Sequence, residues 1–223
     1  MLIVGPMCRV DALSSGRAVT FSAVNHVARI TGLGAPVKRD RLLGLRLSVI
    51  EGGQELGAAK LIQPGEGNLS ARIDQDRFLV TPTLKDKSRL DPDELIEIEI
   101  NSHRVPEGAS TEVEMHRAIY AVFPSVHAVV HAHPVKVLAL ADEGSMPDPS
   151  RLPNGGTALD RVAWVDDFPV GSRSLADEVA RGIAQAPALV LAAHGAVTIG
   201  ATVDQAVLRM IRLERLALTT RGG

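Results

Sequence analysis

Two histidines separated by one residue end an apolar run in the segment AVVHAHPVK, residues 128–136. The side chains of a strand alternate between its two faces, so His131 and His133 project from the same face. Two imidazoles on one face can bind a single metal ion at ordinary Zn–N distances. His194 ends a second apolar run and precedes Gly195, where the backbone can turn sharply. Three histidines at strand ends predict an open metal site with a coordination position left for water or substrate.

Glu112 is the candidate acid/base beside this site. It lies at the start of the helical pattern in STEVEMHRAIYAVFP, residues 110–124, where an acidic side chain also interacts favourably with the helix dipole. Two interpretations are therefore open: a helix-terminal carboxylate with no further role, or a general base next to the metal. His116, one turn further on, is expected to be structural and is the spare ligand if one of the three fails. The other histidines fit ordinary core or surface positions: His26, His103 and His127.

The glycine-rich segment PGEGNLSAR, residues 64–72, is a candidate oxyanion site. It does not match a dinucleotide-binding fingerprint, because Ser70 stands where the third glycine would be. It also lacks the lysine of a phosphate-binding P-loop. The segment is either a plain turn or a pocket of small residues that offers backbone N–H groups and the Asn68 amide to an anion.

Composition restricts the class of protein. The 223 residues include 24 basic and 26 acidic side chains, for a formal net charge of −2, and only 3% of residues are aromatic. This balance gives no support to a nucleic-acid or anionic-membrane partner. No apolar run reaches the length of a transmembrane helix, and the first residues do not form a signal-peptide pattern. The single cysteine, Cys8, fits a reducing compartment, so we expect a cytoplasmic protein.

Hydrophobic periodicity predicts strands and helices that alternate along the chain. Residues 38–61 have an imperfect helical pattern, which the two glycines at positions 52 and 53 are expected to interrupt. Residues 110–124 form a clearer helical pattern, with a capping box from Thr111 to Glu114 and a closing proline. Strands are expected around residues 68–74, 77–83, 95–100, 126–133 and 188–200 and within 160–172, and further helices at 175–185 and 202–218. This order, without repeats, favours one mixed α/β domain.

The sequence HAHP with an upstream glutamate also occurs in metal-dependent isopeptidases of the JAMM type. Those enzymes need a serine near position 141 and an aspartate near position 144. This chain has Ala141 and Gly144, which excludes that class.

Four blocks follow one another along the chain: GNLSAR, LVTPT, STEVEMHRAIYAVFPSVHAVVHAHP and LVLAAHGAVTIGATVDQA. Together they resemble the class II aldolase/adducin family, closest to its L-fuculose-phosphate-aldolase-like members. The resemblance implies a single three-layer α/β/α domain over residues 37–223, with a central, largely antiparallel mixed sheet. Residues 1–36 lie outside the blocks and are expected to form an N-terminal extension. The family also implies a homotetramer with active sites at subunit boundaries.

The resemblance implies roles for individual residues. His131, His133 and His194 match zinc ligands, and Glu112 matches the catalytic acid/base. The positions that hold a substrate phosphate in aldolases of this family correspond here to Asn68, Thr83, Ser110 and Thr111. Zinc is the expected cofactor, with Mn²⁺, Co²⁺ or Fe²⁺ as alternatives for histidine ligands.

The expected activity is retro-aldol cleavage of a sugar phosphate or a related hydroxy-ketone. A divalent metal that chelates the hydroxyl and carbonyl oxygens would stabilise an enediolate as the C–C bond breaks, while Glu112 moves the proton. Epimerisation, dehydration or decarboxylation at the same site is the alternative activity. A third possibility is a metal-free interaction module like the adducin head, which keeps the fold without catalysis.

Leu84 departs from the family pattern, which has glycine after the threonine or serine of the phosphate loop. A leucine at this position is expected to narrow the approach of a phosphate to the backbone N–H groups. Lys85 and Lys87 are candidates to supply positive charge instead, and a substrate without phosphate is the other alternative.

Aldolases of this type use a tyrosine from the neighbouring subunit, in the loop after the histidine pair, to protonate the leaving aldehyde. The only tyrosine of this chain, Tyr120, lies before that pair, and residues 142–160 contain no phenol. Asp148 and Asp160 are candidate replacements, and the sequence does not choose between them.

Overall fold

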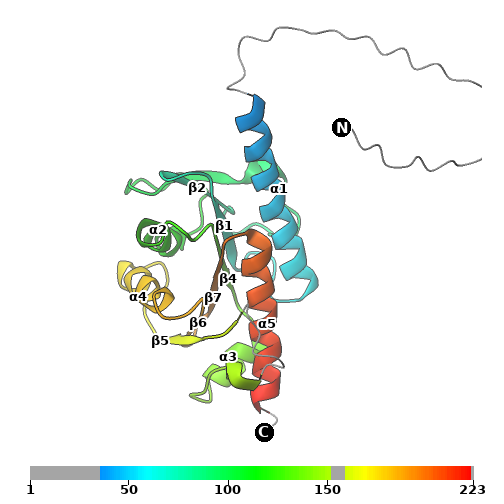
Figure 1. The fold of residues 1–223 in the computed structure, drawn as a ribbon, viewed down its shortest axis with the longest axis vertical. Helices are drawn as coiled ribbons and strands as arrows, with labels where there is room; N and C mark the ends of the chain where they lie inside the picture. The colour runs from blue at the N-terminus through cyan, green and yellow to red at the C-terminus, as the bar shows by residue number, and fades with distance from the viewer. Residues whose placement is uncertain (1–35, 152–158, 222–223) are drawn as a thin grey trace, which may run out of the picture. The chain divides into compact units, whose positions relative to one another are not determined.

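The computed structural model describes residues 36–151 and 159–221. Within them, seven strands form one sheet in the order β3-β2-β1-β4-β7-β6-β5 (Figure 1). Every neighbouring pair is antiparallel except β5 and β6, which run parallel. The prediction of a central, largely antiparallel mixed sheet is therefore confirmed. The strands are β1 (Asn68–Arg72), β2 (Arg77–Val80), β3 (Ile96–Glu99), β4 (Ala128–Ala132), β5 (Ala163–Val165), β6 (Ala188–Leu191) and β7 (Gly195–Gly200).

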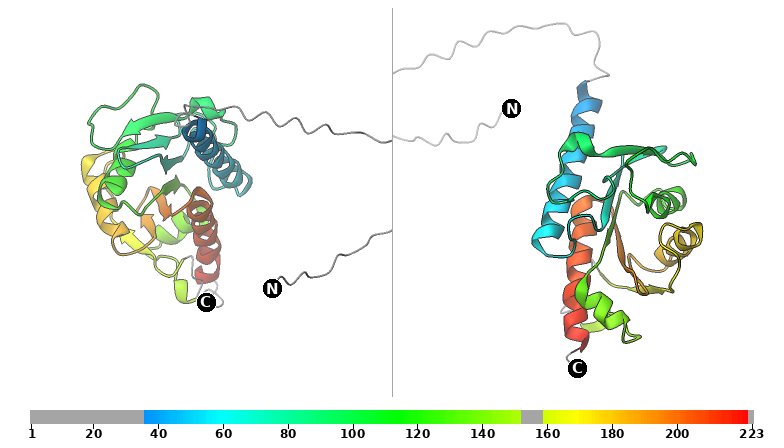
Figure 2. Two further views of the ribbon diagram at one scale, coloured as in Figure 1. Left: turned by 45° about the horizontal axis from the view of Figure 1, so that its top comes forward. Right: turned by 180° about the vertical axis from the view of Figure 1, so that it is seen from behind.

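Five α-helices in the described ranges cover both faces of the sheet and give the expected three layers (Figure 1). One face carries α1 (Pro36–Ala58), α3 (Val135–Ala141) and α5 (Val203–Arg221), and the other carries α2 (Val113–Val122) and α4 (Arg173–Ile183). On the first face α1 packs against α5, and on the second α2 packs against α4 (Figure 2). Two short 3-10 turns complete the described elements, η1 (Pro92–Glu94) and η2 (Pro149–Arg151). None of these helices is long and apolar enough to cross a membrane.

Alternation along the strands divides the buried side chains into two layers. Leu69 and Ala71 of β1 belong to the apolar cluster under α1 and α5, whereas Val129 of β4 belongs to the cluster under α2 and α4. The residues between the apolar positions of β1 therefore face α2. His131 projects from the same face as Val129, because one residue separates them. The centre of the α2 face thus carries polar side chains from two neighbouring strands.

The register of the central strands brings the candidate site residues to one end of the sheet. Asn68 of β1 pairs with His131 of β4, and His131 pairs with Val197 of β7. His194 lies in the turn between β6 and β7, which ends beside β4. A bridge between Pro82 and Ala109 joins the loop after β2 to the loop before α2. Segments that are far apart in the sequence therefore meet at this end.

The first helix is unbroken, so the expected interruption at the two glycines is wrong. α1 runs continuously from Pro36 to Ala58 through Gly52 and Gly53. A Cβ atom at Gly53 would overlap the carbonyl oxygen of Lys87, and one at Gly52 would lie 2.7 Å from Cγ1 of Val203. The glycines therefore permit close packing of α1 against the loop after β2 and against α5.

The start of α2 also differs from the prediction. Glu112 is the N-cap residue, and its side chain makes no capping hydrogen bond. The expected capping box from Thr111 to Glu114 does not form; instead, the Glu112 N–H donates to the Ser110 hydroxyl at 3.3 Å. The expected N-terminal extension, residues 1–36, lies outside the described residues apart from its last residue, and the boundary at residue 37 stays a prediction.

Gly53→Ala is expected to destabilise the fold, because the added methyl group would overlap the Lys87 carbonyl oxygen. Overpacking of this kind costs about 1–3 kcal/mol. Gly44→Ala is the matched control in the same helix: nothing lies within 4 Å of its added methyl group, so it should gain about 0.5–1 kcal/mol of helix propensity. Urea denaturation of both variants beside the wild type measures the free energies of unfolding, and equal effects at the two positions would contradict the close approach.

Candidate metal centre and active site

Three histidines meet at the end of the sheet where β4 finishes. One ring nitrogen from each of His131, His133 and His194 lies within 4.8 Å of the other two. The Nε2 atoms of His131 and His133 are 3.2 Å apart. His131 is fully buried, whereas His133 and His194 are half-buried. The cluster therefore has a buried side and an accessible side.

His131 is oriented as a metal ligand would be. Its Nδ1 atom lies 3.0 Å from the Ala196 carbonyl oxygen, so Nδ1 carries the proton and the unprotonated Nε2 faces the cluster. Burial lowers the pKa of His131 to about 3, although the nearby Glu112 carboxylate acts in the opposite direction. The ring is therefore neutral near pH 7, and neutral imidazole is the form that binds a metal.

Gly195 allows the three rings to approach one another. A Cβ atom at this position would lie 2.6 Å from the Ala132 carbonyl oxygen and 2.8 Å from Cδ2 of the His133 ring. Any side chain at residue 195 would therefore displace β4 or the histidine cluster. The left-handed backbone of this turn belongs to Ala193, with a φ of 52°, so the glycine is needed for space.

The Glu112 carboxylate lies between two of the histidines. Its Oε2 atom is 3.2 Å from Nε2 of His131, and its Oε1 atom is 3.0 Å from Nε2 of His194. The Asn68 amide donates a hydrogen bond to Oε2 at 2.8 Å. Burial by itself would raise the pKa of Glu112, but the hydrogen bond from Asn68 and the contact with His194 act in the opposite direction and hold the pKa below its usual value. Glu112 is therefore ionised and can accept a proton.

Two fully enclosed side-chain atoms lack a hydrogen-bond partner in the described part of the chain, and both belong to this site. They are Glu112 Oε1, whose contact with His194 lacks hydrogen-bond geometry, and His194 Nδ1. Enclosed polar atoms are normally paired, so the pair points to a missing ligand. Three imidazoles beside a carboxylate form a donor set that suits a divalent transition metal. The residues present therefore fit a metal site.

Residues 48–220 match the family described as Class II Aldolase and Adducin N-terminal domain. This chain belongs to that family. It is 29% identical to L-fuculose phosphate aldolase of Methanococcus maripaludis over 160 residues, 71% of this chain and 86% of the relative. It is 30% identical to methylthioribulose-1-phosphate dehydratase of a Bradyrhizobium species over 196 residues, 76% of this chain and 86% of the relative. The crystal structure of L-fuculose-1-phosphate aldolase from Thermus thermophilus matches with a TM-score of 0.73 and 30% identity, over 82% of this chain and 95% of that one.

The four positions expected to hold a phosphate in this class II aldolase family member have different surroundings. Asn68 is buried, and both its amide oxygen and its amide nitrogen are hydrogen-bonded to side chains at the start of α2. Ser110 is also buried and accepts the Glu112 N–H. Thr83 is half-buried and Thr111 is exposed, each in one of the two loops that the bridge joins. Their role toward a phosphate stays a prediction.

The two candidate lysines in the loop after β2 differ in exposure and in partners. Lys85 is exposed and pairs with Glu94 at 3.5 Å. Lys87 is 2% exposed, and no residue within 36–151 and 159–221 accepts a hydrogen bond from its ammonium group. Burial lowers the pKa of Lys87, while nearby carboxylates, among them Glu112, act to raise it. The Lys87 side chain is therefore enclosed, but its ammonium nitrogen is not among the fully enclosed atoms without a partner. A cation that reaches the surface of the fold without an acceptor is a candidate to bind an anion.

Leu84 adopts the left-handed conformation that glycine would favour, with a φ of 56°. Its side chain is 82% exposed. The expected narrowing of the approach to the loop backbone stays a prediction.

A set of buried polar contacts beside the site was not predicted from the sequence. His116 is hydrogen-bonded through Nε2 to the Asn68 oxygen and through Nδ1 to the Ser70 hydroxyl, the latter at 2.6 Å. The Tyr120 hydroxyl lies 2.8 Å from the same serine oxygen. His116 therefore points to β1 and is not part of the histidine cluster. The sequence does contain a matching pattern. Asn68 and Ser70 are two residues apart along β1, and Glu112, His116 and Tyr120 follow one another at intervals of four residues along α2.

The proton donor expected in the loop after the histidine pair is unassigned. Asp148 and Asp160 are both exposed, and they form ion pairs with Arg151 and Arg161 respectively. Residues 152–158 of this loop lie outside the described residues.

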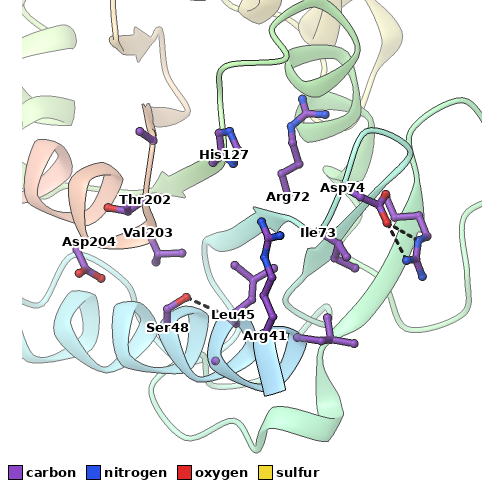
Figure 3. Close-up of a pocket in the computed structure, with 14 residues that line it drawn as sticks. Arg41, Leu45, Ser48, Arg72, Ile73, Asp74, His127, Thr202, Val203 and Asp204 are labelled. Atoms are coloured by element: carbon purple, nitrogen blue, oxygen red, sulfur yellow. Dashed lines mark hydrogen bonds and ion pairs between the residues drawn. The ribbon is translucent and has the colours of Figure 1, made fainter. Parts of the chain in front are cut away.

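A cavity of about 730 Å³ lies away from this chemistry (Figure 3). Its lining comes from α1, the end of β1 and the start of α5, and it includes Arg41, Arg72 and His127. Because Asn68 pairs with His131 at one end of β1 and β4, Arg72 and His127 lie at the opposite end of these strands. The cavity shares no residue with the histidine cluster, so its size gives no reason to move the candidate active site.

Lys87→Met is expected to raise the free energy of unfolding by about 1 kcal/mol or more, because it replaces a partly desolvated charge on a nearly buried side chain by an apolar group of similar size. Lys85→Met is the matched control, since its exposed pair with Glu94 contributes little and the change should stay within about 0.5 kcal/mol. Thermal denaturation measures both variants. A Lys87→Met protein less stable than the wild type would show that Lys87 has a structural role.

Proposed function

We propose that this chain is a zinc-dependent class II aldolase that cleaves a sugar phosphate or a related hydroxy-ketone. The observation that carries the proposal is the position of Glu112, whose carboxylate oxygens lie within 3.2 Å of Nε2 of His131 and of His194. An ionised carboxylate in contact with a metal-binding cluster can move a proton on a substrate held there. Mn²⁺, Co²⁺ and Fe²⁺ suit the same donors.

His131, His133 and His194 would hold the metal, which supplies Lewis-acid stabilisation of negative charge on the substrate oxygens when bound. Glu112 takes and returns the proton that cleavage of the C–C bond requires. Asn68 donates to Oε2 of this carboxylate, so Oε1, which has no hydrogen-bond partner among the described residues, is the oxygen that would take the proton. The buried side of the cluster keeps water away from the reacting groups.

The phosphate of the substrate would lie between the two joined loops, near Thr83, Ser110 and Thr111. Lys87 supports this placement, because it is a buried cation that the carboxylate of Glu112 influences and that has no acceptor among the described residues. A phosphate oxygen would supply the missing hydrogen bond. The relatives named above act on phosphorylated sugars by their names.

A dehydratase, epimerase or decarboxylase at the same site is the second candidate. The position of Tyr120, the only tyrosine of the chain, favours this candidate. Tyr120 is buried against Ser70, so it is not the loop tyrosine that would protonate the leaving aldehyde in an aldolase. A metal-free module like the adducin head would leave the enclosed atoms of Glu112 and His194 unsatisfied. A homotetramer in the cytoplasm, without nucleic-acid or membrane partners, remains our expectation.

Deuterium exchange into dihydroxyacetone phosphate, the simplest hydroxy-ketone phosphate, tests the proposal without knowledge of the natural substrate. Zinc-loaded wild-type protein should exchange the α-protons in D₂O, as followed by proton NMR. Glu112→Gln keeps an oxygen that can accept from Asn68 but cannot take up the proton, so exchange should fall by about 10²–10⁴-fold.

The products of reaction with a panel of ketose phosphates then distinguish between the two candidates. A ketone plus an aldehyde identifies an aldolase, whereas a dehydrated, epimerised or decarboxylated product identifies the second candidate. Exchange that persists after chelation of the metal, or that is unchanged in Glu112→Gln, would contradict the roles assigned to both.

A further inference from the structure

A row of polar side chains crosses the apolar core between β1 and α2. Asn68 and Ser70 occupy alternate positions of β1, and Glu112, His116 and Tyr120 recur at intervals of four from the N-cap of α2. None of the five is more than 7% exposed. Polar groups are costly to bury compared with apolar ones of similar size. Packing alone therefore does not account for this row.

The chemistry of the groups fixes the direction of each hydrogen bond. The Asn68 side chain donates through Nδ2 to Glu112 Oε2 at 2.8 Å, since an amide nitrogen donates and a carboxylate oxygen accepts. The Asn68 oxygen then faces His116 Nε2, and because this oxygen only accepts, Nε2 carries the proton. His116 is fully buried, and burial lowers its pKa to about 4. The ring is therefore neutral, and its Nδ1 atom is an acceptor.

The remaining two bonds follow from that tautomer. The Ser70 hydroxyl, 2.6 Å from Nδ1, donates to His116. The Tyr120 hydroxyl, 2.8 Å away, in turn donates to the Ser70 oxygen. The guanidinium of Arg72 lies over the Tyr120 ring at 4.7 Å from its centre and closes the far end of the row. The row is thus one chain of hydrogen bonds, each donated in the same direction, that starts at Tyr120 and ends on the Glu112 carboxylate.

We propose that Tyr120, Ser70, His116 and Asn68 are positioning residues that hold the Glu112 carboxylate in one orientation. Oε2 is occupied by the Asn68 amide, and Oε1 is turned toward His194. This inference rests on the acid/base role that the proposed function gives to Glu112. It assigns Asn68 a role in the chain instead of the phosphate contact expected from the family resemblance.

Nitrogen-15 NMR of the full-length, histidine-labelled protein tests this chain of hydrogen bonds without a substrate. His116, assigned by loss of its signals in His116→Gln, should be a single neutral tautomer with the proton on Nε2. Ser70→Ala should move the Nδ1 resonance toward that of a nitrogen without a hydrogen bond. Glu112→Ala should shift the Nε2 resonance, whereas Glu114→Ala, on the same helix but outside the chain, should leave it in place. A protonated Nδ1, or an Nε2 that does not respond to Glu112→Ala, would overturn the inference.

Exchange of the α-protons of dihydroxyacetone phosphate distinguishes positioning from a purely structural role. His116→Gln can still present an N–H to Asn68, whereas His116→Leu cannot. The leucine variant should lower kcat by about 10- to 100-fold with KM unchanged, and the glutamine variant should recover most of the loss. Equal losses in both variants, or an effect confined to KM, would contradict positioning. A wild-type protein that does not exchange would refute the proposed function alone, and the NMR result would then decide the inference.

Discussion

The buried negative charge of Glu112 is the interaction on which the arrangement of this site depends. A carboxylate that is only 7% exposed needs donors close at hand, because an unpaired charge in an apolar core is strongly unfavourable. Asn68 on β1 donates to it, and the rings of His131 on β4 and His194 between β6 and β7 lie beside it as candidate metal ligands. The strand order β1-β4-β7 is therefore what makes the site possible, since it places these segments side by side beneath the start of α2.

The same constraint explains why the α2 face of the sheet is polar at its centre and apolar around it. Asn68 and Ser70 connect Glu112 to His116 and Tyr120, and apolar side chains such as Val129 and Met115 surround the row. Each polar group in the row is satisfied by its neighbour, so the core tolerates it. In the part of the chain that the structure describes, the enclosed atoms without a partner belong to the end of the row, as Glu112 Oε1, and to the neighbouring His194, as Nδ1.

Local patterns in the sequence were sufficient for the histidine pair and for most elements. The spacing of His131 and His133 required only the alternation of a strand, and the apolar runs marked β4, β6 and β7. The order of the strands was different, because pairing of Asn68 with His131 joins residues that no local pattern connects. That part of the prediction came from the family resemblance.

Other features could not be predicted because they depend on tertiary contacts. Nothing in the sequence distinguishes exposed Lys85 from buried Lys87, which are two residues apart in one loop. The two glycines of α1 predict a break because glycine also ends helices; only the carbonyl oxygen of Lys87 shows that Gly53 is needed for close packing.

The metal content of purified protein, wild type beside His194→Ala, tests the central claim most directly. We predict near-stoichiometric divalent metal in the wild type and its loss in the variant, whereas a wild type that holds no metal even after incubation with zinc would contradict the account.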